Sequence, residues 1–264
     1  MYKAIFVDID GTLRDDNRNI SQRTKDVIKK ISENGTYVVI TSGRPKKYTE
    51  NISRMCNASK YIISSGGASI DDYEGNLNLK RDVISKKTCE KIYKMAQELG
   101  IRVVMNMGEK RYANRLVGKK DELLIENLDE LLKNSLPEQC VILDENYEKI
   151  KEIREKVLLM TDVVINNQHK CFTNPDVPKN GIIYIDITNS TISKGKAIKS
   201  FCKYLNIDLK DTLSIGDEYN DISMFETTGK SMAMGNAPDA VKQKASFVGL
   251  TNNEDGVAVY LENI

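Results

Sequence analysis

Short apolar runs alternate with amphipathic stretches near both ends of this 264-residue chain. Runs of strand length, rich in β-branched and aromatic side chains, lie at residues 4–7, 36–40, 61–63, 212–215, 231–234 and 246–248. Apolar positions three or four residues apart predict helices over 21–33 and 194–205, and Pro45 fits the first turn of another. Strands alternating with helices predict an α/β fold with a doubly wound, mostly parallel sheet, whose ligands lie beyond the carboxyl ends of the strands.

The pattern changes between residues 83 and 186. A hairpin is predicted over 70–80, just before this stretch. Within the stretch we expect helices at 85–99, 119–133 and 146–160, and strands at 101–107, 140–143, 161–166 and 182–187. It holds neither a glycine-rich phosphate loop nor a cluster of carboxylates. We therefore predict an α+β domain over 83–186, inserted into a core domain made of 1–82 and 187–264.

Composition and charge exclude several classes of protein. Hydrophobic residues make up 40% of the chain, as in ordinary globular proteins. The net charge of +1 favours neither a nucleic-acid nor a membrane partner, and no apolar run approaches the length of a membrane span. Five scattered cysteines without Cys-x-x-Cys pairs favour a reducing cytoplasm over a disulfide framework. The single histidine, His169, nearly excludes histidine-based triads.

The first strand ends in two carboxylates, within the stretch Asp8-Ile9-Asp10-Gly11-Thr12. Side chains two residues apart in an extended chain share a face, so Asp8 and Asp10 repel each other unless a cation or a proton relieves them. Mg²⁺ suits such hard oxygen ligands. Asp-x-Asp alone favours an ordinary solvated strand end, but the five-residue motif should arise by chance in roughly one of a few hundred chains of this length.

Polar residues also follow the second strand and open a late helix. Ser42-Gly43 offers a hydroxyl and a backbone N–H that could hold phosphoryl oxygens, although an ordinary turn has the same sequence. Arg44 beside it is a candidate contact for an anionic substrate. Lys194 and Gly195 lie at a helix start that both residue types disfavour, so we expect an anion nearby. The alternative is that Lys194 is an ordinary solvated surface lysine.

The strand at 212–215 ends at a second acidic stretch, Gly216-Asp217-Glu218-Tyr219-Asn220-Asp221. If a helix starts here, Asp217 and Asp221 lie one turn apart and repel each other, and a divalent cation shared with Asp8 would relieve that repulsion. The alternative is helix capping by Asp217, with Asp221 as a favourable acid in the first turn.

In chain order, these four stretches resemble the motifs of the haloacid dehalogenase (HAD) superfamily of phosphohydrolases. The insert resembles the type IIB cap of that superfamily, so the chain looks like a Cof-type sugar-phosphate phosphatase. The resemblance covers essentially the whole chain. It implies a HAD-like, Rossmann-type core, a cap that determines specificity, and Mg²⁺-dependent hydrolysis of a small phosphorylated metabolite through an aspartyl-phosphate.

The resemblance assigns roles to individual residues. Asp8 is the expected nucleophile and Asp10 the expected general acid and base. The expected Mg²⁺ ligands are Asp8, the backbone carbonyl of Asp10, and Asp217, with Asp221 in support. The expected phosphate contacts are the N–H of Ile9 together with Ser42, Gly43, Lys194 and Asn220. Two positions depart from the family pattern: Gly66 stands where relatives commonly have asparagine, and Ser42 where threonine is more usual.

Two other functions stay open at this point. One is a phosphosugar mutase, because type IIB relatives include such a group. The other is a catalytically silent phosphosugar-binding protein, which lost carboxylates would favour and which this chain's Asp8, Asp10 and Asp217 disfavour. We expect no nucleic-acid or membrane partner and a monomer or small homo-oligomer. Asn236 is expected to border the site. The polar residues 166–169 could contact sugar hydroxyls, but we expect an ordinary surface loop there.

Overall fold

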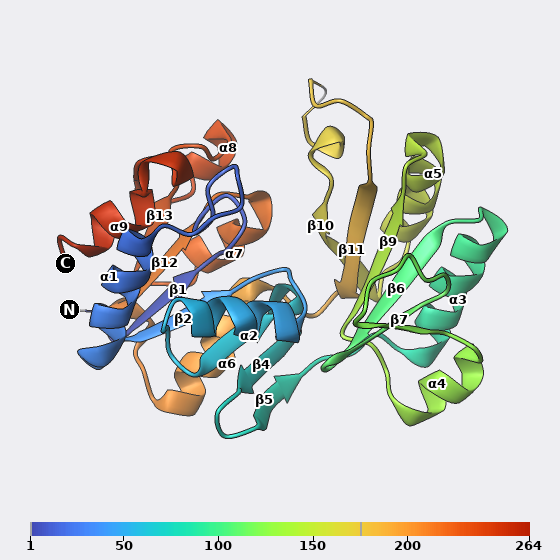
Figure 1. Cartoon of the computed structure of the whole chain (residues 1–264), viewed down its shortest axis with the longest axis horizontal. Coiled ribbons are helices and arrows are strands. Elements are labelled where there is room, and N and C mark those ends of the chain that lie inside the picture. The colour runs from blue at the N-terminus through green and yellow to red at the C-terminus, as the bar shows by residue number, and fades with distance from the viewer. Residues whose placement is uncertain (1, 175) are drawn as a thin grey trace. The chain divides into compact units, whose positions relative to one another are not determined.

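The computed structural model describes residues 2–174 and 176–264. They form two compact units, each with its own sheet (Figure 1). One unit comprises the chain up to Lys80 together with Ser193–Ile264, and the other comprises Arg81–Ile192. No helix in the described ranges is long and apolar enough to cross a membrane.

The first unit contains an eight-stranded sheet in the order β14-β13-β12-β1-β2-β3-β4-β5. Its strands are β1 (Ala4–Val7), β2 (Tyr37–Thr41), β3 (Tyr61–Ser64), β4 (Ser69–Asp72), β5 (Leu77–Arg81), β12 (Thr212–Gly216), β13 (Lys230–Ala233) and β14 (Phe247–Val248). The strands from β14 to β3 are parallel, and β4 runs antiparallel to β3. The predicted mostly parallel sheet is confirmed.

Helices cover both faces of this sheet, because side chains along each strand alternate between two apolar clusters. Ile5 and Val7 of β1 pack with the helices of one face, and Ala4 and Phe6 pack with those of the other. The helices of the first face are α1 (Gln22–Glu33), α2 (Lys46–Met55) and α9 (Gly256–Leu261). Those of the second face are α6 (Lys194–Leu205), α7 (Ile222–Phe225) and α8 (Asp239–Lys242). The sheet is therefore doubly wound, as predicted.

The register of the parallel strands brings distant residues to one edge. Val7 of β1 lies beside Ile40 of β2 and Ile215 of β12. The residues that follow these three strands therefore meet at the carboxyl edge of the sheet.

The second unit contains a six-stranded sheet in the order β10-β11-β9-β6-β7-β8. Its strands are β6 (Arg102–Met107), β7 (Lys110–Ala113), β8 (Glu122–Leu124), β9 (Gln139–Asp144), β10 (Val163–Gln168) and β11 (Ile183–Asn189). The pairs are antiparallel except β7 with β8. Its helices α3 (Lys86–Glu98), α4 (Leu128–Asn134) and α5 (Tyr147–Leu158) share one apolar cluster with the sheet. Strand β11 extends past residue 186, where the predicted insert ends.

The helix predicted over 119–133 is wrong in its first half. The structure places strand β8 there, and helix α4 starts only after Asn127, whose side chain accepts a hydrogen bond from the N–H of Glu130. Glu122 of β8 is buried in an ion pair with Arg102 of β6. Strand β7, which β8 pairs with, was not predicted at all. The apolar spacing of residues 123–132 therefore indicated a single helix where two short elements form.

Two smaller predictions also need correction. Helix α2 begins at Lys46, so Pro45 is its N-cap rather than a residue of its first turn. The polar residues 166–169 are not a loop, because strand β10 continues to Gln168 and His169 caps the short 3₁₀ helix at Lys170–Phe172.

Candidate active site

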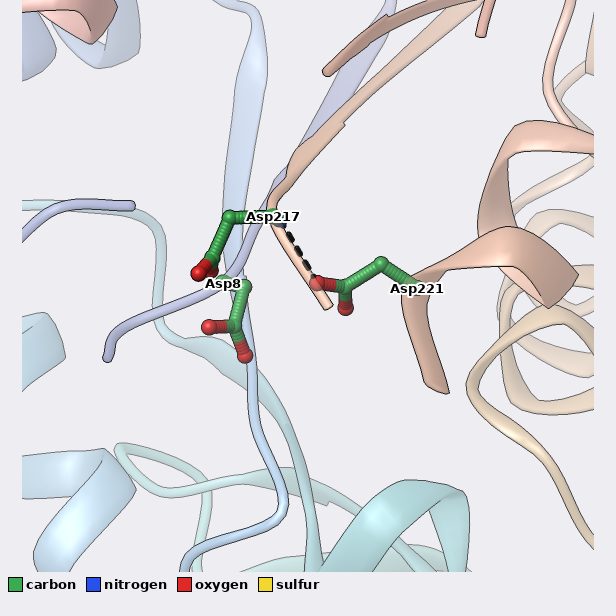
Figure 2. A group of neighbouring side chains, drawn as sticks. All are labelled: Asp8, Asp217 and Asp221. Carbon is green, nitrogen blue, oxygen red and sulfur yellow. Dashed lines mark hydrogen bonds between the residues drawn. The ribbon is translucent and has the colours of Figure 1, made fainter. Parts of the chain in front are cut away.

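Three buried carboxylates meet at the carboxyl edge of the core sheet (Figure 2). Asp8 follows β1, Asp217 follows β12, and Asp221 ends the 3₁₀ helix η4 (Tyr219–Asp221). One oxygen of each lies within 4.8 Å of the others, and the three residues are 7%, 1% and 0% exposed. The structure thus brings Asp8 next to two acids that follow it by more than two hundred residues in sequence, as predicted.

Lys194, the first residue of α6, completes this group. Its Nζ donates hydrogen bonds of 2.6 Å to Asp8 Oδ1 and to Asp221 Oδ1. The lysine is 1% exposed, so the alternative of a solvated surface lysine is wrong. Its position in the first helical turn is offset by these two acids, which supply negative charge next to the helix start.

Gly195 has a packing explanation rather than an electrostatic one. A Cβ at this position would lie 2.0 Å from the backbone oxygen of Ser223, just after the start of α7. Only glycine allows α6 and α7 to approach so closely. The inference that Gly195 indicates an anion is therefore not needed, although the neighbouring lysine does face two.

Only half of the capping arrangement considered above is correct: Asp221 lies in the first turn of η4, but the N-cap is Glu218 rather than Asp217. Asp221 Oδ2 accepts hydrogen bonds from the backbone N–H groups of Asp217, at 2.9 Å, and Glu218, at 3.0 Å. The side chain of Asp217 caps nothing and instead accepts a 2.9 Å hydrogen bond from Thr12 Oγ1. Gly11 makes room for it, because a Cβ there would lie 2.2 Å from Asp217 Oδ2. Asp221 therefore fixes the backbone and leaves the Asp217 carboxylate facing Asp8.

The group carries more negative than positive charge, since one lysine faces three carboxylates. Burial raises the pKa of Asp8 from 3.8 to about 7, although Lys194 pulls it down. Burial, with the charges of Asp8 and Asp221, raises the pKa of Asp217 well above its ordinary value. Burial alone would lower the pKa of Lys194, but the charges of Asp221 and Asp8 outweigh it and raise that pKa. A divalent cation held by hard oxygen ligands would relieve this excess charge.

The raised pKa of Asp8 predicts a pH dependence of stability in chelating buffer. Between about pH 4 and pH 7 the folded state keeps a proton that the unfolded state has already released, so this group lowers stability as pH rises through that window. Asp8→Asn removes the effect. Urea unfolding in the presence of chelator measures the free energy of unfolding of both proteins. We expect the value for Asp8→Asn, relative to that of the native protein, to rise by roughly 2–4 kcal/mol from pH 4 to pH 8. A constant difference would contradict the raised pKa.

The Asp10 side chain does not join the buried group. Its Oδ2 accepts a 2.7 Å hydrogen bond from Arg44 Nε, and both side chains are about half exposed, at 40% and 50%. The guanidinium of Arg44 also lies over the ring of Tyr48. Arg44 is therefore engaged with the expected general acid, an arrangement that neither residue's sequence context indicates.

The expected phosphate-binding residues surround the same edge. Ser42 follows β2, is 2% exposed, and its Oγ accepts a 3.1 Å hydrogen bond from the N–H of Arg44, the residue after Gly43. Asn220 lies in η4 directly before Asp221. Ile9 follows Asp8, and its side chain packs into the core. These residues therefore lie at or next to the carboxyl edge of the core sheet, and their contact with phosphate stays a prediction.

Gly66 supports this edge through its backbone. It lies in the short 3₁₀ helix at Ser65–Gly67 with a positive φ of 69°. Its N–H donates a 3.0 Å hydrogen bond to the carbonyl of Ser42. Gly66, which departs from the family pattern, therefore supports the Ser42-Gly43 turn through its backbone N–H rather than through a side chain.

Comparison with known proteins gives a consistent result. A family model for haloacid dehalogenase-like hydrolases matches residues 5–261. A Bacillus subtilis protein named 5-amino-6-(5-phospho-D-ribitylamino)uracil phosphatase YcsE is 27% identical over 262 residues, which cover 97% of this chain and 93% of that protein. A haloacid dehalogenase-like hydrolase from Bacteroides thetaiotaomicron superposes with a TM-score of 0.85 and 23% identity, over 100% of this chain and 99% of that one. The subclass IIB sugar phosphatase BT4131 superposes with a TM-score of 0.78 and 21% identity, over 99% and 98%.

Because the family model spans nearly the whole chain, this protein belongs to the haloacid dehalogenase-like hydrolases. Within them it is a phosphatase, with the fold of subclass IIB. The resemblance of the four motifs to those of the haloacid dehalogenase superfamily is confirmed.

Proposed function

We propose that this phosphatase hydrolyses phosphomonoesters of small phosphorylated metabolites, with Mg²⁺ at the buried carboxylates and an aspartyl-phosphate formed on Asp8. The observation that carries the proposal is the buried group of Asp8, Asp217 and Asp221 around Lys194 at the carboxyl edge of the core sheet. A nucleophilic carboxylate, a site for a cation and a fixed lysine are the groups that phosphoryl transfer through an enzyme-bound aspartate requires.

The donor set fits Mg²⁺. Asp8 and Asp217 would hold the ion together with the backbone carbonyl of Asp10, and these are all hard oxygen ligands. Asp221 would support the site indirectly, because its two oxygens are bound to Lys194 and to the backbone of Asp217. Bound Mg²⁺ would offset negative charge on the transferring phosphoryl group.

The proposed reaction has two steps. In the first, an oxygen of the Asp8 carboxylate attacks phosphorus, the bond from phosphorus to the ester oxygen breaks, and Asp10 gives its proton to that oxygen. An alcohol leaves and an acyl phosphate stays on Asp8. In the second, water attacks the same phosphorus and gives a proton to Asp10, and the bond from phosphorus to Asp8 breaks. Inorganic phosphate leaves, one water is consumed, and both carboxyl groups return to their starting state.

To act as the acid, Asp10 must leave Arg44, take up a proton from solvent and turn to the leaving-group oxygen. Exposed ion pairs contribute at most about 1 kcal/mol, so leaving Arg44 costs little. Lys194, by contrast, is held in place by two buried acids and would bind a phosphoryl oxygen with little reorganisation. Ser42, Gly43, Asn220 and the N–H of Ile9 are the further phosphate contacts that we propose.

We propose sugar phosphates and related phosphorylated polyols as substrates. The names of two similar proteins support this class: one is a sugar phosphatase, and the other acts on a phosphorylated ribityl compound. We assign recognition of the polyol to the second unit, whose sheet carries the buried polar residues Asn106 and Gln139 on the face away from its apolar cluster. There Asn106 alternates with the core residues Met105 and Met107 and donates a 2.7 Å hydrogen bond to Gln139.

A phosphate-release screen tests this function. Purified protein is incubated with a panel of phosphorylated sugars, sugar alcohols, nucleotides and amino acids, with water as the only acceptor. We expect release with several sugar or polyol phosphates in the presence of Mg²⁺, and a fall to background when a chelator removes the ion.

The same screen separates the alternatives. A mutase would release little phosphate without an acceptor sugar and would move the phosphoryl group once one is added. A phosphosugar-binding protein would release none but would still bind. Phosphate release that persists in chelator would contradict the proposed Mg²⁺ site.

A further inference from the structure

We propose that Asn236 is a positioning residue that orients the Asp217 carboxylate for Mg²⁺, an inference that rests on the metal site proposed above. Asn236 lies in the turn after β13 and is exposed at the rim of the buried carboxylates. None of the roles assigned above includes it.

The amide of Asn236 bridges two parts of the site. Its Nδ2 donates a 2.8 Å hydrogen bond to the carbonyl of Gly11 and approaches Asp217 Oδ2 at 3.5 Å. Its Oδ1 accepts a 3.0 Å hydrogen bond from the backbone N–H of Asn252. This last contact fixes the amide's orientation, because a flipped amide would turn its oxygen towards a carbonyl and a carboxylate and its NH₂ towards an N–H donor.

Both oxygens of Asp217 are thereby held from outside its own strand. Thr12 Oγ1 donates to Oδ1 at 2.9 Å, and Asn236 Nδ2 approaches the other oxygen, Oδ2, at 3.5 Å. Both partners are joined to the loop after Asp8, Thr12 by the chain and Asn236 through the Gly11 carbonyl. The orientation of one proposed metal ligand is therefore tied to the loop that follows the other.

A second set of hydrogen bonds fastens that loop further along. Asn252 Nδ2 donates to the carbonyl of Arg14 at 2.9 Å and to Asp16 Oδ1 at 3.1 Å. Asn253 Nδ2 donates to Asp16 Oδ2 at 2.9 Å, and Asn253 Oδ1 accepts from the N–H of Asp16 at 3.1 Å. We call Asn236, Asn252 and Asn253 the asparagine clasp. Asn236 is its inner end, against Asp217, and Asn253 is its outer end, against Asp16.

The clasp supplies a matched pair of variants. Asn236→Ala and Asn253→Ala make the same chemical change on the same network, but only the first removes a contact to a metal ligand. Residues that orient metal ligands commonly change metal affinity or activity by about 10–100-fold when removed. Asn236 is exposed, so its replacement opens no cavity in the core.

The test is calorimetric titration of native protein and both variants with MgCl₂ alone. We expect the Mg²⁺ Kd of Asn236→Ala to rise by about 10–100-fold and that of Asn253→Ala to stay within about twofold of native. Thermal unfolding in chelator should give similar midpoints for all three. In phosphate release, the Mg²⁺ concentration for half-maximal rate should rise in parallel with the Kd, while the rate at saturating Mg²⁺ stays within a few-fold of native.

Each other outcome has a definite meaning. Equal Mg²⁺ affinity in the two variants would overturn the positioning role. A clearly lower unfolding midpoint of Asn236→Ala in chelator would show a general structural role and would overturn it as well. Native protein that binds no Mg²⁺ would instead overturn the proposed function on which the inference rests.

Discussion

Asp8→Asn should reduce phosphate release on the order of 10⁴-fold or more while the protein stays folded. The amide cannot form the acyl phosphate, because its nitrogen and its carbonyl oxygen are poor nucleophiles compared with a carboxylate. Folding should not suffer, since the native carboxylate is buried beside two other acids and burial already raises its pKa. The measurement is phosphate release at saturating Mg²⁺, with thermal unfolding of the same samples.

Asp211→Asn is the matched control for this variant. Asp211 directly precedes β12, at the opposite end of the strand from Asp217, and pairs with Lys3 at 3.2 Å. The same chemical change there should leave the rate of phosphate release within about twofold of native, because the ion pair is partly exposed and remote from the carboxyl edge. Substantial turnover by Asp8→Asn would rule out Asp8 as the nucleophile.

Lys194→Met should lower both stability and activity. Methionine keeps the length of the buried side chain but leaves Asp8 and Asp221 without their shared cation, and breaking a buried pair in this way typically costs about 3–5 kcal/mol. Removing a preorganised contact to the transferring group typically costs on the order of 10²–10³-fold in rate. Urea unfolding and phosphate release at saturating Mg²⁺ measure the two effects.

Lys199→Met provides the comparison on the same helix. Lys199 is exposed on α6, so losing its charge should change stability by less than about 0.5 kcal/mol and leave the rate unaffected. If Lys194→Met were as stable and as active as Lys199→Met, the buried ion pairs of Lys194 would have neither the structural nor the catalytic importance argued here.

The core fold and the carboxylate group could be predicted from sequence because they depend on local patterns and one topological rule. An apolar strand followed by acids occurs before Asp8 and before Asp217, and parallel strands place their carboxyl ends together. The helix that starts at Lys194 was predicted to its first residue, since Ser193 is a clear N-cap. Each of these signals spans only a few consecutive residues, so each can be recognised in a single sequence.

The contacts that orient these groups could not be predicted in the same way. Thr12 and Asp217 are 205 positions apart, and Asn236 meets Gly11 over 225, so only the folded loops bring them together. The pairing of Asp10 with Arg44 likewise depends on how two loops approach. The wrong helix at 119–133 has a related cause: the pairing of β8 with β7 and the burial of Glu122 outweigh the helical spacing of nearby leucines.

The most direct measurement of the central claim is acid quenching during turnover. Native protein with Mg²⁺ and the best substrate from the screen is quenched on the millisecond scale, digested, and analysed by mass spectrometry for phosphorylated peptides. We predict a phosphate on the peptide that contains Asp8, bound to that side chain and absent from Asp8→Asn. Steady turnover without modification of Asp8 at any quench time, or with the phosphate on another residue, would contradict the account.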